Sequence, residues 1–179
     1  MPRLQSIEPE QATGKTAAIY GKVKSWMKRV PNLYKGLGNS PQALEGYLML
    51  ADLIGQGSLT PQEQQIVFMV ANEFNECHYC VAAHSPGLKA VGFDDEAMLD
   101  IRRGKAEDPK HQALIDFVRR VLETKGFVSN AELAAVKAAG YSDRNIADLM
   151  PILAQKLMSN YFNHIHETEL DFPEAPPLD

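Results

Sequence analysis

The sequence predicts an all-α fold, a single helical domain over residues 1–179 with seven or eight helices. Three observations support it. Apolar residues recur at intervals of three and four along most of the chain. Capping residues followed by proline or glutamate mark several helix starts. No segment has the period-two alternation of a strand, and the sequence lacks the Asn-Gly and Asp-Gly pairs of tight hairpins.

The first elements follow from this spacing and from the prolines. Glu8 to Val30 carries apolar residues at helical intervals, and Pro31 is expected to end that helix. The glycine-bearing segment 32–40 is expected to be a loop or short turn. Ser40-Pro41 then supplies a cap and a first-turn proline for a second helix, which ends near Gly55.

A central helix is predicted to begin at Thr60-Pro61-Gln62-Glu63, which combines an N-cap, a first-turn proline and a capping-box glutamate. The next run, Ile66 to Ala71, is apolar on every side. A helix without a polar face is buried all round. We therefore expect this helix to lie in the core and to lead into the segment that carries both cysteines.

The remaining helices have clear start signals. A helix from Cys77 to about Ser85 is expected to kink or stop at Pro86-Gly87. Four more are expected to begin at Asp94 or Asp95, Pro109, Ser129 and Ser142. The last runs from about Asp143 to about His166, with a bend at Pro151. The proline-rich tail 171–179 is expected to be extended, and either disordered or lying on a partner subunit.

Composition narrows the function. The formal net charge of -5 and the lack of concentrated Lys and Arg argue against nucleic-acid binding. No run of about 18 apolar residues is long enough to span a membrane, and the N-terminus lacks a signal-peptide core. With only two cysteines, placed close together, a disulfide framework is not expected. We expect a cytoplasmic protein that binds neither nucleic acid nor membrane.

The two cysteines and a histidine form the most informative pattern, Cys77-His78-Tyr79-Cys80 with His84 four residues later. On a helix, Cys77, Cys80 and His84 fall within a sector of about 60°. An interruption of the helix near Asn75 would put both sulfurs in the first turn of the following helix, where unpaired N–H groups stabilise a thiolate.

His84 is placed to accept the proton of Cys80 and to hold its thiolate as an ion pair. If Cys80 is oxidised to a sulfenic acid, Cys77 stands within a turn to condense with it. The assignment of Cys80 as the attacking sulfur and Cys77 as the resolving one rests mainly on His84, since the helix dipole alone favours Cys77 as the thiolate. Two alternatives are a pair of buried thiols that act as small hydrophobes, and a metal site completed by His164, His166 or a neighbouring subunit.

The segment NECHYCVAAHS resembles the signature of the AhpD-like, carboxymuconolactone decarboxylase superfamily, in its cysteine-bearing, peroxidase-related branch. The longer stretch from Leu59 to Ser85 and the C-terminal SNYFNHIHETELDFP are similar to the same branch. The resemblance implies an all-helical fold, homo-oligomers (dimer-based, trimers or hexamers), and thiol-dependent reduction of hydroperoxides. It also implies that Cys80 is peroxidatic, that Cys77 resolves, and that His84 relays protons.

Two departures from the family pattern concern proton transfer. The family glutamate twelve residues before the first cysteine is Gln65 here, and a glutamine cannot take a proton. Glu73, one helical turn before Cys77, and Glu63 are candidate replacements on spacing alone. Tyr79 stands where the family has a relay histidine. The family's decarboxylases generally lack the cysteine pair, so decarboxylation is not expected.

The sequence thus predicts a hydroperoxide reductase that needs no cofactor or metal. Its catalytic candidates are Cys80, Cys77, His84, Gln65 and Glu73. Its expected partners are a hydroperoxide substrate and a dithiol reductant, either a lipoyl domain or a thioredoxin-like protein. The alternative function is a thiol–disulfide exchange protein or redox sensor without peroxidase turnover.

Overall fold

The computed structural model describes residues 2–178, so residues 1 and 179, the ends of the predicted domain and tail, lie outside it. Within 2–178 the chain forms nine helices and no strand, which confirms the all-α prediction. The helices are α1 Gly14–Met27, α2 Asn32–Leu37, α3 Pro41–Gly55, α4 Pro61–Phe74, α5 His78–Ala90, α6 Asp95–Arg102, α7 Pro109–Thr124, α8 Asn130–Ala138 and α9 Asp143–His166.

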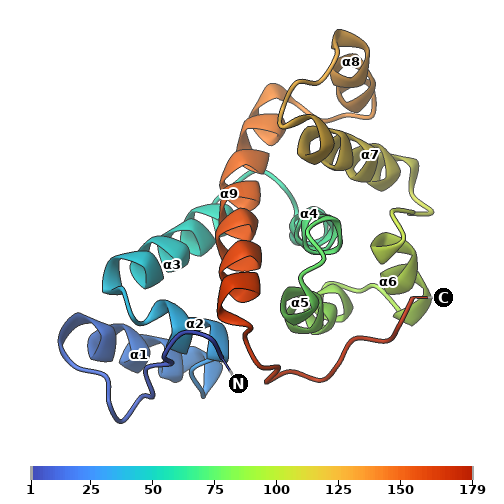
Figure 1. Cartoon of the computed structure of the whole chain (residues 1–179). Coiled ribbons are helices and arrows are strands. Elements are labelled where there is room, and N and C mark those ends of the chain that lie inside the picture. Colours follow the sequence, from blue (N-terminus) through green and yellow to red (C-terminus); the bar gives the residue numbers. More distant parts are fainter. Residues whose placement is uncertain (1, 179) are drawn as a thin grey trace.

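Helix α4 is the centre of the fold, as predicted from its apolar run. It packs against α5, α6, α7 and α9, and Figure 1 shows these helices around it. Ile66, Val67 and Met69 are fully buried. The long helix α9 lies between α3 and α4 and contacts both, together with α2 and α5. One side of α9 therefore faces the start of α5, where the cysteines lie.

The capping box of α4 is formed as the sequence predicts. The Thr60 hydroxyl accepts a hydrogen bond from the Glu63 amide at 3.2 Å, and a Glu63 carboxylate oxygen accepts one from the Thr60 amide at 2.8 Å. The two bonds satisfy N–H groups that have no partner within the helix.

We expect Thr60→Ala to lower the free energy of unfolding by about 1 kcal/mol, because it removes the acceptor for the Glu63 amide. Urea unfolding monitored by circular dichroism measures this, with Thr60→Ser as the matched control that keeps the hydroxyl. Equal unfolding midpoints for Thr60→Ala and Thr60→Ser would show that the cap does not stabilise α4.

Two expectations for the N-terminal region are wrong. The predicted helix 8–30 is shorter, because residues 8–12 form a separate turn on the Glu8 carbonyl and Lys28 ends α1 in the left-handed conformation. The expected loop 32–40 contains α2. Leu33 and Leu37, one turn apart, are both buried, so apolar packing stabilises a helix there.

The glycines in residues 32–40 suggested a loop, but Gly36 lies within a helix at a close contact with α9. A Cβ at Gly36 would lie 2.7 Å from Phe162 and 2.8 Å from His166. The glycine therefore allows α2 to approach α9 closely and does not break the helix. Helix α5 continues through Pro86 to Ala90, so the expected stop is not present, and the expected kink stays a prediction. The bend expected at Pro151 in the continuous α9 stays a prediction.

The proline-rich tail forms an extended segment that lies on its own chain; we call residues 171–178 the C-terminal arm. Figure 1 shows it running from the end of α9 past α5 toward α6. Asp171 pairs with Arg29 at 2.6 Å, and the Pro176 carbonyl accepts a hydrogen bond from Arg102. The expected extended conformation is seen in these residues, and charged groups of α6 and of the α1–α2 connection hold the arm. Its expected contact with a partner subunit stays a prediction.

Candidate active site

Both cysteines lie at the beginning of α5, as the sequence predicts. Helix α4 ends at Phe74, Glu76 takes a left-handed conformation with a φ of 54°, and Cys77 is the N-cap of α5. Cys80 is in the first turn, where the helix dipole stabilises negative charge. Both sulfurs belong to free thiols, and the residues are 1% and 2% exposed.

Helix α9 supplies the groups that face the two sulfurs. Lys156, Asn160 and Asn163 follow one another at intervals of four and three, which puts them on one face of the helix. All three are buried. The side-chain amide of Asn163 donates to the Cys80 sulfur at 3.1 Å and also lies 3.7 Å from the Cys77 sulfur.

Asn160 is held in place by a short chain of amides. Its Nδ2 donates to Asn72 Oδ1 at 2.9 Å, and its Oδ1 accepts from Asn75 Nδ2 at 2.9 Å. Asn72 Nδ2 in turn donates to the Cys80 carbonyl at 3.2 Å. These bonds join the end of α4, the first turn of α5 and α9, so the donors around Cys80 are fixed before any substrate arrives.

The surroundings of Cys80 favour a thiolate. Burial raises its pKa, but this is outweighed by a hydrogen bond from the Cys77 thiol, by the positive charge of Lys156 and by the amides of Asn160 and Asn163. Together they lower the pKa of Cys80 to about 6. A large fraction of Cys80 is then ionised at neutral pH, as a sulfur nucleophile requires.

The pKa of Cys77 is shifted in the opposite direction. Its pKa is raised, first because its thiol donates a hydrogen bond to Cys80, and then because of burial and the neighbouring thiolate charge. The two sulfurs therefore share one proton, and the proton stays on Cys77. This ordering agrees with the roles that the sequence predicts, with Cys80 as the attacking sulfur.

His84 contacts Lys156 and Gln65. His84 Nε2 lies 2.8 Å from Lys156 Nζ, and His84 Nδ1 lies 3.4 Å from Gln65 Oε1. The Gln65 side-chain oxygen can only accept a hydrogen bond, and the Lys156 ammonium can only donate one. We therefore assign the tautomer of His84 in which Nδ1–H donates to Gln65 and Nε2 accepts from Lys156. Within residues 2–178, neither cysteine is a hydrogen-bond partner of His84, so the expected direct contact with Cys80 is not formed.

The charge states of His84 and Lys156 follow from their burial. Burial, followed by the Lys156 charge, keeps the pKa of His84 well below its usual value, so the imidazole is neutral. Burial also lowers the pKa of Lys156 to about 8, although the two cysteine sulfurs act in the other direction. Lys156 thus carries the positive charge expected of His84, with a pKa close enough to neutrality for proton transfer.

Gln65 reaches His84 because of a glycine one turn beyond the histidine. A Cβ at Gly87 would lie 2.6 Å from Gln65 Oε1, so a larger residue there would displace the Gln65 amide from its present position. The position twelve residues before Cys77 is therefore part of the same cluster. Gln65 acts there as an acceptor that orients the imidazole.

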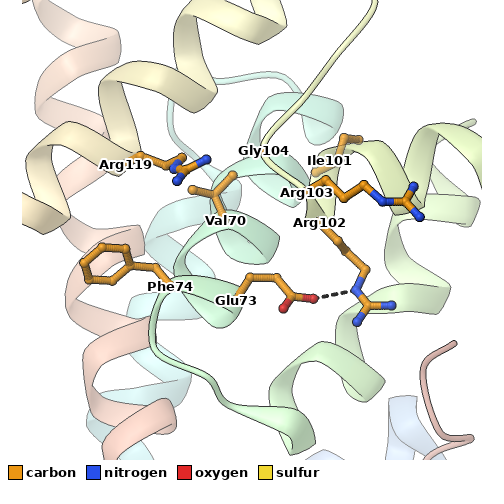
Figure 2. Close-up of a pocket in the computed structure, with 8 residues that line it drawn as sticks. All are labelled: Val70, Glu73, Phe74, Ile101, Arg102, Arg103, Gly104 and Arg119. Carbon is orange, nitrogen blue, oxygen red and sulfur yellow. Dashed lines mark hydrogen bonds and ion pairs between the residues drawn. The ribbon is translucent and has the colours of Figure 1, made fainter. Parts of the chain in front are cut away.

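Glu73 is not part of this cluster, although spacing made it a candidate. It pairs with Arg102 Nε at 2.5 Å, and Figure 2 shows its carboxylate turned toward that arginine. Helical spacing places Glu73 next to Cys77 only if the helix is unbroken, whereas α4 ends at Phe74 and the chain turns before Cys77. Glu63, the other acid named, is committed to the α4 cap and to Lys110 at 2.8 Å.

The other histidines considered above lie elsewhere. His166 is buried against Phe162 with Ser6 Oγ at 3.3 Å from Nε2, and His164 stacks on Tyr161. Within 2–178, no cluster of three or more His, Cys, Asp or Glu side chains has an arrangement suited to a metal ion.

Sequence reasoning missed the three α9 residues Lys156, Asn160 and Asn163. Their signal is present, because polar side chains recur at core-facing positions of a helix that also carries Leu149 and Ile152. Buried polar residues are uncommon and need partners. The sequence alone does not say which face of α9 meets the cysteines.

Comparison with known proteins identifies a family region and the fold. Residues 41–123, from α3 to α7, match the model of the carboxymuconolactone decarboxylase family. This match supports the expected relation to the AhpD-like, carboxymuconolactone decarboxylase superfamily over that part of the chain. No curated protein matches the chain at a significant level of similarity.

No helix within the described residues has the length and apolar character needed to cross a membrane.

Three solved structures share the fold. An uncharacterised peroxidase-related protein from Ralstonia eutropha JMP134, described as an alkylhydroperoxidase AhpD core, has a TM-score of 0.85 at 22% identity, covering 95% of this chain and 92% of that one. A peroxidase-related protein from Silicibacter sp. TM1040 has a TM-score of 0.78 at 18% identity, covering 88% and 85%. The debrominase Bmp8, as its C82A variant with 2,3,4-tribromopyrrole, has 0.76 at 10%, covering 94% and 91%.

Proposed function

Because the chain carries a carboxymuconolactone decarboxylase family region and has the AhpD-like fold, we propose that it is a thiol-dependent hydroperoxide reductase. One observation carries the proposal. The Cys80 sulfur receives a hydrogen bond from Asn163 in a buried site that also holds the Lys156 amine and a second thiol, Cys77. A stabilised thiolate, a proton donor and a resolving thiol are the groups that this reaction needs.

In the first step the Cys80 thiolate attacks the terminal oxygen of the hydroperoxide. An S–O bond forms as the O–O bond breaks, and the leaving alkoxide takes a proton from the Lys156 ammonium. The products are an alcohol, a sulfenic acid on Cys80 and a neutral Lys156 amine. The neutral His84 accepts a hydrogen bond from Lys156 and so keeps the amine oriented.

In the second step Cys77 resolves the sulfenic acid. The oxidation removes the thiolate charge that raises the pKa of Cys77, so its proton can pass to the neutral Lys156 amine. The Cys77 sulfur attacks the Cys80 sulfur, the S–O bond breaks, and the departing hydroxide leaves as water with the proton from Lys156. The site then holds a disulfide.

An external dithiol completes the cycle by reducing this disulfide and becoming oxidised itself, which returns two electrons and two protons. Because both cysteines are at most 2% exposed, a slender dithiol such as a lipoyl arm fits the site better than a broad protein surface. The same burial favours a small hydroperoxide over a protein disulfide as the oxidant. The alternative, thiol–disulfide exchange or redox sensing without turnover, uses the same pair.

Hydroperoxide consumption coupled to dithiothreitol oxidation tests the proposal on purified protein. We expect sustained turnover of tert-butyl hydroperoxide, with one hydroperoxide consumed for each dithiothreitol oxidised. A disulfide that dithiothreitol reduces readily, in a protein without hydroperoxide turnover, would reject the peroxidase and leave the exchange or sensing function.

The two pKa shifts predict a bell-shaped dependence of kcat/KM on pH. The rate should rise as Cys80 ionises around its pKa of about 6, and fall as Lys156 loses its proton around its pKa of about 8. Because the groups interact, the two limbs belong to the pair. Initial rates in buffers of constant ionic strength measure the profile. A rate that keeps rising into alkaline pH, as for an ordinary thiol, would contradict the arrangement.

A further inference from the structure

A cavity lies against the first half of α5, the helix that carries Cys80. It has a volume of about 310 Å³, near the lower end of the range of roughly 300–1,000 Å³ for small-molecule sites. We call it the aromatic pocket, after the six aromatic residues in its lining: Trp26, Tyr34, Tyr47, Phe68, Tyr79 and Phe172. They come from α1, α2, α3, α4, α5 and the C-terminal arm, so the fold gathers them from most of the chain.

The inner end of the aromatic pocket is the first half of α5. Tyr79, Ala83 and His84 line it, and Tyr79 and Ala83 flank Cys80 along this helix. Tyr47 and Tyr79 belong to the same buried cluster as both cysteines. His84 and Gln155 are polar groups in the lining, and His84 is the group bonded to Lys156. The lining of this pocket therefore includes a group that is bonded to the amine of the proposed reaction.

The C-terminal arm contributes Phe172 to the wall of this pocket, and the preceding residue, Asp171, anchors the arm there. Asp171 Oδ2 accepts from Arg29 Nη1 at 2.6 Å and from the Asn32 amide at 3.0 Å. Asp171 Oδ1 accepts from the Tyr79 hydroxyl at 2.8 Å, and that hydroxyl accepts from the Leu33 amide at 3.2 Å. The carboxylate thus ties the arm to the residue immediately before Cys80.

Phe172 is held between the same two partners. The Arg29 guanidinium carbon lies 4.3 Å from the centroid of the Phe172 ring, and the Tyr79 ring meets it edge-on, with centroids 5.7 Å apart and planes at 84°. Asp171 and Phe172 therefore fix each other's position. At the exposed side of the pocket Trp26, 59% exposed, supplies another aromatic surface.

We propose that the aromatic pocket binds the organic part of the substrate, and that Phe172 is a specificity-determining residue that selects apolar, ring-bearing hydroperoxides. Asp171 is a positioning residue that acts through Phe172 and Tyr79. Aromatic walls stack on flat apolar groups and give little to a small polar peroxide. The proposal rests on the hydroperoxide reductase function and adds the substrate class and the role of the arm.

Binding of cumyl alcohol, the product that cumene hydroperoxide would yield, tests the pocket without turnover. Trp26 is the only tryptophan, so its fluorescence reports directly on this site, and calorimetry gives an independent Kd. We expect saturable binding of cumyl alcohol with a change in Trp26 emission, and none with tert-butanol. Phe172→Ala should weaken binding roughly three- to tenfold through loss of one aromatic wall.

The same variant should lower the ratio of kcat/KM for cumene hydroperoxide to kcat/KM for hydrogen peroxide, and Asp171→Asn should lower it in the same direction. Phe127→Ala is the matched control, because Phe127 is 87% exposed and lies outside the pocket lining. Absence of cumyl alcohol binding to the wild type, or an unchanged ratio in Phe172→Ala, would overturn the proposal even if hydroperoxides are turned over. Saturable binding at Trp26 without any turnover would support the pocket and reject the peroxidase.

Discussion

Cys80→Ser is expected to abolish hydroperoxide turnover, lowering kcat by roughly 10³-fold or more, as for loss of a nucleophile in other enzymes. A serine hydroxyl does not ionise near neutral pH, so the hydrogen bond from Asn163 and the charge of Lys156 have no anion to stabilise. Dithiothreitol-coupled consumption of tert-butyl hydroperoxide measures the loss.

Cys77→Ser is the matched variant, because it changes the neighbouring sulfur in the same way. It should consume one equivalent of hydroperoxide and then stop or slow, since a sulfenic acid forms on Cys80 without an internal thiol to resolve it. Full turnover in Cys80→Ser, or loss of the single event in Cys77→Ser, would reverse the proposed order of the sulfurs.

Lys156→Met is expected to lower kcat/KM at neutral pH by about 10²-fold, within the range for loss of a general acid. The substitution removes the charge that helps to lower the pKa of Cys80, so a smaller fraction of the sulfur is ionised. It also removes the proton donor for the leaving alkoxide. The pH dependence of Cys80 alkylation by iodoacetamide, followed by mass spectrometry, should move to higher pH.

Stability separates this effect from misfolding. Removing one partner of a buried pair is destabilising, so Lys156→Met should unfold at a lower urea concentration than the wild type, and its rates are compared in buffer where circular dichroism shows the native helix content. Lys137→Met is the control, because Lys137 pairs with Asp143 at the surface of α8. An alkylation profile that is identical in Lys156→Met and the wild type would show that Lys156 does not stabilise the Cys80 thiolate.

Local signals in the sequence were enough for the central part of the fold. The capping box of Thr60 and Glu63 and the apolar run that follows specify α4, because both act within a few residues of one another. A break near Asn75, with Cys80 in a first helical turn, was considered from the sequence only as a condition for a stabilised thiolate, and the structure shows it. These features depend on neighbours in the chain and little on the rest of the molecule.

The errors come from packing between distant segments. Gly36 suggested a loop because its packing partner, α9, lies about 120 residues further along the chain. Glu73 was assigned by helical spacing across a point where the helix ends. Lys156, which holds the charge expected of His84, depends on how α9 is rotated against α5. That rotation is set by the whole core.

In the proposed reaction the Cys80 sulfur is the atom that receives oxygen from a hydroperoxide. The most direct measurement is a single turnover of Cys77→Ser with one equivalent of tert-butyl hydroperoxide, trapping with dimedone, and peptide mapping by mass spectrometry. The proposed mechanism predicts one dimedone adduct, on Cys80, formed as the hydroperoxide disappears. Unmodified Cys80 with the hydroperoxide still present, under conditions where wild-type protein forms its disulfide with another oxidant, would contradict it.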